Sequence, residues 1–331
     1  MQAHRTAGAV RIYGTLGPAC RDADTLEQMF RAGMTGLRLN LSHAGLAQAA
    51  PELETARQAA ARCGLTPELL IDLQGPELRI GALAAPLTLT PGQRLSPEEL
   101  ALPAAAQAAL AEAAPGQELL LDDGRLLLCL ETPRSLLVRR GGLLQSRKSL
   151  ALPGLGLEPP AVTEKDRANL ALAAACGVSA VMQPFVRGRE DLLQVRRAME
   201  QAGCGGLRLL AKIENLRGVE ALEEILPACD ELVIARGDLG NSMELWKLPG
   251  VQKRISARCR AAGRDFMVVT QMLDSMTHRP VPTRAELSDI FNAVLDGAAS
   301  VMVTGETASG EYPVETIRYL VRTVREAEAF V

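Results

Sequence analysis

The sequence is poor in several features that would have narrowed its function at once. Aromatic residues make up only 3% of it, so aliphatic side chains must fill the core, and base-stacking platforms for single-stranded nucleic acid are not expected. Lysine plus arginine number 36 and aspartate plus glutamate 39, which gives a formal net charge of −3. This near balance offers no basis for nucleic acid or an anionic membrane as a partner.

Paired cysteine motifs and long apolar runs are also missing. None of the seven cysteines stands in a C-x-x-C pair, which argues against a disulfide framework or a structural zinc site and favours a reducing compartment. The first residues contain no apolar segment typical of a secretory signal. The longest apolar stretch, residues 170–182, is interrupted by Gly177 and Ser179 and is too short to span a bilayer. We therefore expect a cytoplasmic protein.

Short apolar runs instead alternate with longer helical segments along most of the chain. The runs lack strict alternation, which is typical of strands buried on both faces. The predicted strands are residues 10–15, 36–40, 69–73, 180–185, 207–213, 231–235, 266–270 and 300–304. The predicted helices are residues 24–32, 45–63, 164–176, 190–202, 218–226, 248–262, 284–296 and 313–330. This repeated strand–helix order favours an α/β fold of the (β/α)8 (TIM) barrel type over a doubly wound sheet.

One region interrupts that rhythm. After the third predicted strand, residues 75–156 contain short strand-like pieces at 86–90, 118–121, 125–131 and 136–139, and an alanine-rich stretch that reads as a helix or linker. We predict a small β-rich domain inserted after strand three, with the barrel formed by residues 1–74 and 157–331. Because such loops follow the carboxyl ends of barrel strands, where active sites lie, the insertion is expected to act as a lid.

Polar residues follow the predicted strands, and that is where barrel enzymes carry their chemistry. Glu214 and Asp238 follow neighbouring strands, and two carboxylates with substrate oxygens suit Mg²⁺. Lys212 and Arg38 supply cations for an anionic substrate. A divalent metal ion with nearby cationic side chains is typical of active sites that catalyse phosphoryl transfer. Each spacing alone is common on protein surfaces, but its recurrence at nearly every strand end favours a site.

Eight ordered segments of the sequence resemble the pyruvate kinase family. They are Gly14-Thr-Leu-Gly-Pro-Ala19, Arg38-Leu-Asn-Leu-Ser-His43, Asp72-Leu-Gln-Gly-Pro-Glu-Leu-Arg79, Lys212-Ile-Glu-Asn215, Ala235-Arg-Gly-Asp-Leu-Gly240, Thr270-Gln-Met272, Arg279-Pro-Val-Pro-Thr-Arg-Ala-Glu286 and Gly305-Glu-Thr307. The resemblance implies a (β/α)8 barrel with a capping β domain. It also implies a glycolytic enzyme that moves phosphoryl from phosphoenolpyruvate to ADP, and then protonates the enolate to pyruvate.

The resemblance also implies roles for individual residues. Lys212 would neutralise charge on the transferring phosphoryl and the enolate, and Arg38 would grip the phosphoryl group. Glu214 and Asp238 would hold Mg²⁺ or Mn²⁺, and the backbone of Gly237 and Asp238 would receive the substrate carboxylate.

Three further groups of residues complete the implied site. The resemblance implies that Thr270, Thr304 and Glu306 lie on the side where the enolate is protonated. For the nucleotide it implies His43, Arg79, Arg147 and Lys148. For K⁺ it implies Asn40, Ser42, Asp72 and the carbonyl of Leu73.

The sequence departs from the family pattern in several places. Leu73-Gln74 stands where the family has Thr-Lys, Pro184 where it has serine, Ser242 where it has an acidic residue and Thr304 where it has serine. The family's C-terminal domain, which carries its effector site, has no counterpart, so a short, unregulated form is expected, and a homodimer as its assembly.

Two other functions stay open at this point. One is a catalytically weak or inactive paralogue that binds phosphoenolpyruvate or nucleotide as a sensor. The other is a metal-dependent lyase or aldolase that handles a pyruvate enolate without nucleotide. Retention of Lys212 favours chemistry over sensing, and Arg79 with Arg147 favours a nucleotide substrate over the lyase.

Overall fold

Eight parallel strands close into a barrel, which confirms the predicted fold class. The computed structural model describes residues 9–42, 44–122, 124–155, 157 and 159–330. Around the barrel the strands follow the order β1, β15, β14, β13, β12, β11, β3, β2, and every neighbouring pair is parallel. Their bounds are β1 Arg11–Thr15, β2 Gly36–Asn40, β3 Glu68–Asp72, β11 Ala180–Gln183, β12 Arg208–Ile213, β13 Glu231–Ala235, β14 Asp265–Val269 and β15 Ser300–Met302.

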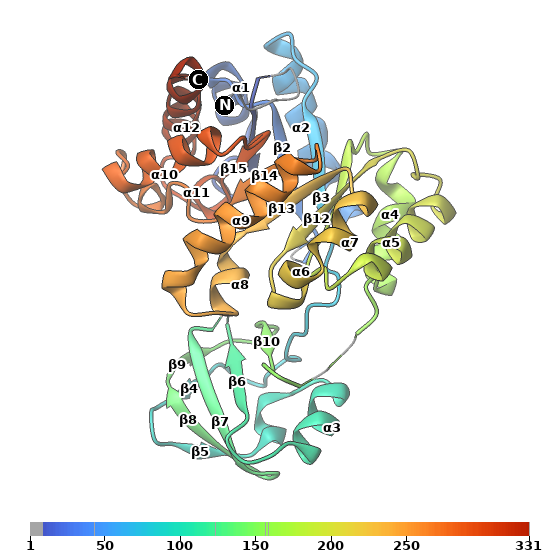
Figure 1. Cartoon of the computed structure of the whole chain (residues 1–331), viewed down its shortest axis with the longest axis vertical. Coiled ribbons are helices and arrows are strands. Elements are labelled where there is room, and N and C mark those ends of the chain that lie inside the picture. The colour runs from blue at the N-terminus through green and yellow to red at the C-terminus, as the bar shows by residue number, and fades with distance from the viewer. Residues whose placement is uncertain (1–8, 43, 123, 156, 158, 331) are drawn as a thin grey trace. The chain divides into compact units, whose positions relative to one another are not determined.

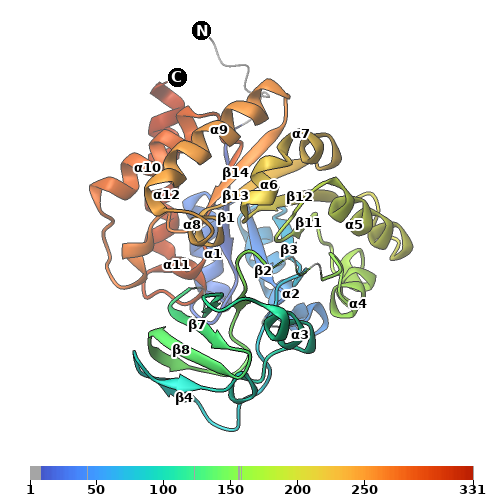
Figure 2. The ribbon, with the colours of Figure 1, turned by 60° about the horizontal axis from the view of Figure 1, so that its bottom comes forward.

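Helices surround the barrel strands, as the ring of coiled ribbons in Figure 2 shows. They are α1 Ala23–Ala32, α2 Leu46–Arg62, α4 Glu164–Ala173, α5 Arg189–Gln201, α6 Leu216–Glu220, α7 Leu222–Ile225, α8 Arg236–Asn241, α9 Leu248–Ala261, α10 Arg284–Leu295, α11 Gly305–Ala308 and α12 Pro313–Phe330, with 3-10 turns η2 Leu226–Ala228, η3 Leu245–Lys247 and η4 Asp274–Thr277. The single helix predicted over residues 218–226 is wrong: the segment is broken into α6, α7 and η2, and Pro227 lies in the last of these. Within the described part of the chain, no helix is both long and apolar enough to cross a membrane.

The chain divides into two compact units, residues 1–75 with 161–331 and residues 76–160. The second unit, labelled from β4 to β10 in Figure 1, contains β4 Leu87–Leu89, β5 Arg94–Leu95, η1 Pro97–Leu100, α3 Ala104–Glu112, β6 Glu118–Leu121, β7 Leu126–Thr132, β8 Ser135–Arg140, β9 Gly142–Leu144 and β10 Leu150–Ala151. Its strands form a five-stranded sheet and a two-stranded one over a leucine-rich core. The alanine-rich stretch is the helix α3. Whether this unit acts as a lid stays a prediction.

Inside the barrel, side chains with a period of two form three layers. An apolar cluster fills the middle. Its members are Tyr13, Leu70, Ala180, Met182, Leu210, Val233, Ala235, Met267, Val269 and Met302. On most of these strands the side chain two residues before or after the cluster member is charged, as in Arg208, Leu210 and Lys212 along β12. Since alternate residues of a strand point to one face, this pattern places a polar layer at each end of an apolar plug.

Four predicted strands end earlier than expected, and the smallest difference is in the run 69–73, where β3 stops at Asp72. The runs ending at Phe185 and Thr270 stop at Gln183 and Val269, because Phe185 (φ 52°) and Thr270 (φ 80°) have left-handed backbone conformations incompatible with a strand. The run ending at Thr304 stops at Met302. Each early end lies at the carboxyl side of the barrel, where the predicted site residues begin.

Candidate active site

Four charged side chains meet at the carboxyl end of the barrel. Lys212 Nζ lies 3.0 Å from Asp72 Oδ2 and 2.9 Å from Glu214 Oε1. Arg38 donates to the same Asp72 oxygen through Nε (2.9 Å) and Nη2 (2.7 Å). Because β11 separates β12 from β3 in the barrel, the Lys212–Asp72 contact crosses the barrel interior. The structure therefore brings together four predicted residues from the carboxyl ends of three strands, β2, β3 and β12.

Burial and mutual attraction set the charge state of this cluster. Burial opposes the ionisation of Asp72, but Lys212 and Arg38 outweigh it and hold the pKa of this carboxyl below its ordinary value. Burial likewise opposes the charge of Lys212, but Asp72 and Glu214 raise the pKa of the ammonium above its ordinary value. Lys212 is thus a fixed positive charge with an exposed side-chain fraction of only 12%. It can stabilise developing negative charge, and it is unsuited to giving up a proton.

The two carboxylates predicted to hold a divalent metal follow adjacent strands. Glu214 comes directly after β12, Asp238 lies in the first turn of α8 after β13, and β12 pairs with β13. Glu214 is buried, and its Oε2 accepts the backbone N–H of Phe185 at 2.8 Å. In the described residues no group of three or more His, Cys, Asp or Glu side chains could hold a metal by itself. Two hard oxygen donors fit a cation that completes its shell with water and substrate oxygens, as Mg²⁺ does.

The four residues predicted to hold a monovalent cation come from β2, β3 and the residues after them. Asn40 and Asp72 are the last residues of these strands and lie directly opposite each other in the register. Asn40 Oδ1 accepts the N–H of Ser42 at 3.1 Å. The side chain of Leu73 is buried in the core between barrel and helices, so replacing a threonine there leaves the main-chain carbonyl as the available ligand. Amide, hydroxyl, carboxylate and carbonyl oxygens suit a hard cation.

Thr270 and Gly237 lie against each other across the β13–β14 edge. A Cβ added to Gly237 would be 3.0 Å from Thr270 Cγ2, so only glycine allows this approach without a shift. Thr304 and Glu306 form a separate pair, in which Glu306 Oε2 accepts the Thr304 N–H (2.7 Å) and Oε1 accepts the Leu273 N–H (3.2 Å). The buried Glu306 carboxylate therefore ties together the loops after β14 and β15.

The predicted nucleotide residues that the structure describes gather within the second unit. Arg79 forms an ion pair with Glu77 (2.8 Å), and its Nη1 donates to the Arg147 carbonyl at 3.0 Å. Lys148 Nζ lies 2.7 Å from Asp122 Oδ1. Arg79 thus lies against the backbone of Arg147, and the side chains of Arg79 and Lys148 are each paired with a carboxylate of the same unit. His43, the fourth predicted nucleotide residue, lies outside the described residues.

Asp166, the third residue of α4, has two roles, of which only the first could be expected from the sequence. Its fully buried carboxylate accepts Thr163 N–H (3.0 Å) and Thr163 Oγ1–H (2.7 Å) as a capping box. It also accepts the N–H groups of Gln74 (2.8 Å) and Gly75 (3.1 Å). Asp166 thereby fixes the turn after Asp72 to the start of α4. The T-x-x-D spacing could predict the cap, but nothing in the sequence indicated the distant backbone donors.

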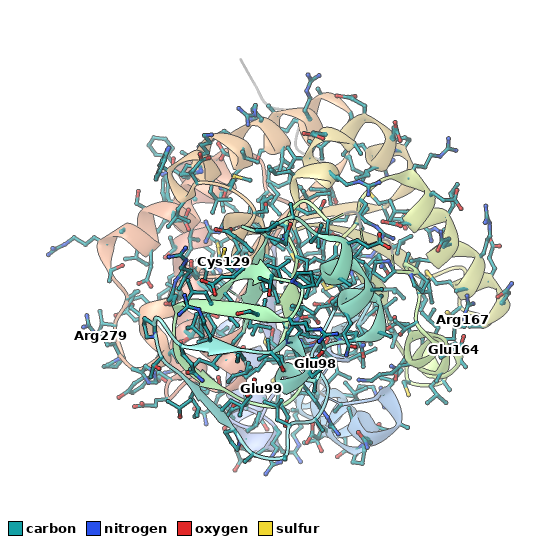
Figure 3. The ribbon with its side chains drawn as sticks, turned by 90° about the horizontal axis from the view of Figure 1, so that it is seen from below. Glu98, Glu99, Cys129, Glu164, Arg167 and Arg279 are labelled. Carbon is teal, nitrogen blue, oxygen red and sulfur yellow. The ribbon has the colours of Figure 1, made fainter. Side chains whose placement is uncertain are left out.

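Neighbouring residues on the first turn of α4 do not share the anchoring role of Asp166. Figure 3 shows Glu164 and Arg167 side by side on the outside of α4, where they form an exposed pair at 3.7 Å. Asp166, in contrast, is buried and accepts hydrogen bonds from the loop that follows β3. The first turn of α4 therefore contains a buried residue that anchors the loop after β3, Asp166, and an exposed one that can serve as its control, Glu164.

Comparison with known proteins adds an independent line of evidence. Residues 7–317 match the family model described as "Pyruvate kinase, barrel domain". The chain is 36% identical over 324 residues to a pyruvate kinase of Geobacillus stearothermophilus, covering 93% of this chain and 55% of the relative. It is 36% identical to one of Methylorubrum extorquens (96% and 68%) and 35% identical to human pyruvate kinase PKLR (98% and 61%). The chain spans about half the length of several curated relatives that it matches.

Proposed function

The chain belongs to the pyruvate kinase family, and from that premise we propose that it transfers the phosphoryl group of phosphoenolpyruvate to ADP, giving pyruvate and ATP. The observation that carries this proposal is the Lys212 ammonium held between Asp72 and Glu214 at the carboxyl end of the barrel. A buried, permanently charged lysine beside Arg38 suits a substrate with a phosphoryl group and a developing enolate.

The proposed roles follow from the positions of the side chains. Arg38 binds the phosphoryl group while Asp72 orients its guanidinium. Lys212 neutralises negative charge on the oxygens of the transferring phosphoryl group and on the oxygen of the enolate that forms. When the P–O bond of phosphoenolpyruvate breaks and the new bond to ADP forms, the enolate carbon accepts a proton on the side of Thr270.

Glu214 and Asp238 are proposed to hold Mg²⁺ or Mn²⁺, and the cation supplies charge neutralisation for the substrate oxygens when bound. The backbone N–H groups of Gly237 and Asp238 orient the substrate carboxylate. In the second unit, Arg79, Arg147 and Lys148 are proposed to contact the nucleotide phosphates, since guanidinium and ammonium groups are the side chains that bind phosphate and Arg79 already bonds the backbone of Arg147.

Asn40, Ser42, Asp72 and the Leu73 carbonyl are proposed to hold K⁺. If so, the rate of pyruvate formation should fall by about tenfold or more when K⁺ is replaced by tetramethylammonium at equal ionic strength, because that cation cannot accept oxygen ligands. Equal rates with the two cations would count against the site. Titration with Na⁺ separates a need for small cations from a general salt effect.

A coupled assay tests the function itself. Pyruvate released from phosphoenolpyruvate, ADP, Mg²⁺ and K⁺ is measured through lactate dehydrogenase, and omission of ADP is the control. Turnover that requires ADP supports the proposal, whereas binding of phosphoenolpyruvate without turnover would favour a sensor. Sedimentation of the purified chain tests the predicted homodimer.

A further inference from the structure

Arg236, the first residue of α8, makes an unusual set of contacts with the loop after β14. Its Nε and Nη2 donate to the Thr270 carbonyl at 3.1 and 2.7 Å, and Nη2 also donates to the Gln271 carbonyl at 3.2 Å. Its Nη1 lies 2.5 Å from Asp289 Oδ2 on α10. The side chain is only 10% exposed. One guanidinium therefore links the end of β13, the loop after β14 and a surrounding helix.

The loop that Arg236 holds is strained. Thr270 (φ 80°) and Gln271 (φ 54°) are consecutive residues with left-handed backbone, and neither is glycine. Such conformations are costly and persist only where surrounding contacts enforce them, which happens preferentially at functional sites. Here the enforcing contacts are identified, because the carbonyls of both strained residues accept hydrogen bonds from the same guanidinium.

The strain also has a consequence for the site. The left-handed turn presses the Thr270 side chain against Gly237, the neighbour of Arg236 in the chain. If the loop relaxed, the Thr270 hydroxyl would move away from the end of β13. Lysine could not replace Arg236, since an ammonium lacks the planar fork that reaches two carbonyls and a carboxylate together.

We propose that Arg236 is a positioning residue that acts through Thr270. By holding the strained Thr270–Gln271 backbone, it keeps the Thr270 hydroxyl on the side where the enolate is protonated, and Asp289 orients the guanidinium for this task. The proposal rests on the proposed function, since it names the residue that organises the proton-transfer half of that reaction.

A double-mutant cycle with proton exchange as the readout tests it. Exchange of the pyruvate methyl protons with D₂O is followed by proton NMR for wild type, Arg236→Lys, Thr270→Ala and the double variant, all with Mg²⁺ and K⁺. Arg236→Lys should slow exchange by about 10²-fold, the effect of displacing a reacting group by about 1 Å. In the Thr270→Ala background the same change should alter exchange by less than about twofold, because the residue through which it acts is gone.

Arg196→Lys is the matched control. Arg196 also joins a backbone carbonyl (Leu207, 3.0 Å) to an aspartate (Asp230, 2.5 Å), but at the amino end of the strands. The Arg196→Lys variant should leave the exchange of the pyruvate methyl protons unchanged. Amide hydrogen exchange of residues 270–272 should be faster in Arg236→Lys and unchanged in Arg196→Lys.

The outcomes separate the two proposals. Equal slowing by Arg236→Lys in both backgrounds, or normal exchange in Arg236→Lys beside an active wild type, overturns the positioning role alone. A folded wild type with neither pyruvate formation nor methyl exchange overturns the proposed function, and with it the catalytic purpose assigned to Arg236. A loop that exchanges no faster in Arg236→Lys overturns the structural premise whatever the activity.

Discussion

The two ends of the barrel carry similar charged residues but use them differently. At the amino end, Glu231 accepts from Arg11 (2.9 Å), Arg208 (3.1 Å) and Ser300, and Arg208 also pairs with Glu68. These are the first residues of their strands. At the carboxyl end, Lys212 and Arg38 surround Asp72 in a comparable way. Both ends therefore seal the apolar plug with a buried carboxylate between cations.

The difference lies in what holds each cluster. Charged side chains bind one another at both ends, and at the amino end these are the contacts that hold the cluster, which is what a structural layer requires. The carboxyl-end cluster is held by loops as well: Phe185 N–H donates to Glu214, and Asp166 accepts N–H groups of the turn after Asp72. In the described part of the barrel unit, the non-glycine residues with left-handed backbone are Phe185, Thr270 and Gln271, and all follow carboxyl ends of strands. Strain and loop anchoring thus mark the end where chemistry is proposed.

The largest expected effect comes from substitutions that remove one buried cation from each end of the barrel. Lys212→Met should reduce turnover by about 10²–10³-fold, since it removes a preorganised charge beside the reacting groups. Arg208→Met, which likewise leaves two carboxylates without their shared cation, should lower stability while the folded fraction keeps its turnover. The coupled assay and urea unfolding followed by circular dichroism measure both. The assignment fails if Lys212→Met keeps turnover within about twofold of wild type.

Asp166→Asn should remove about 1–3 kcal/mol of stability, because an amide cannot accept every hydrogen bond that the buried carboxylate accepts. Circular dichroism is the suitable probe, since the single tryptophan, Trp246, is 80% exposed and reports little on the core. Glu164→Gln, on the exposed side of the same turn, is the control and should change stability by less than about 0.5 kcal/mol. Equal effects of the two substitutions would contradict the anchoring role of Asp166.

The pH dependence of stability should have opposite sign at the two ends. The pKa of Asp72 is lowered, so its contribution to stability is present above its unfolded pKa and is lost as pH falls below about 4. Burial raises the pKa of Glu231, so its contribution is present at low pH and is lost as pH rises above about 4. The free energy of unfolding, measured by urea between pH 3 and 7, should therefore fall by a larger amount on Asp72→Asn as pH rises. The decrease caused by Glu231→Gln should become smaller over the same range. Parallel trends would refute this assignment of charge.

The smallest effect concerns the hydroxyl of Tyr13, which donates to Glu68 Oε2 at 2.6 Å in the amino-end layer. Tyr13→Phe should lower stability by about 1 kcal/mol, the net value of a typical hydrogen bond, and leave turnover unchanged. Steady-state kinetics beside urea unfolding checks both. A loss of turnover would show that the two ends are coupled through the plug.

Most of the barrel could be predicted from the sequence, because strands buried on both faces leave continuous apolar runs between amphipathic helices. The predicted strand positions agree with β1, β2, β3, β11, β12, β13, β14 and β15 to within a few residues. Ordered motifs after these strands also identified Arg38, Asp72, Lys212 and Glu214, since parallel strands must bring their carboxyl ends to one side of a barrel.

Only the tertiary structure decided which groups contact each other. Arg236 reaches carbonyls of residues 34 and 35 positions away, and Asp166 reaches amides more than 90 positions away. A backbone carbonyl or amide has no residue identity, so no motif can mark it as a partner. The left-handed conformations of Thr270 and Gln271 were equally hidden, because neither residue prefers them and surrounding hydrogen bonds impose them. Local residue preferences therefore determined the strands and helices of this protein, whereas long-range hydrogen bonds determined how the ends of those strands became a site.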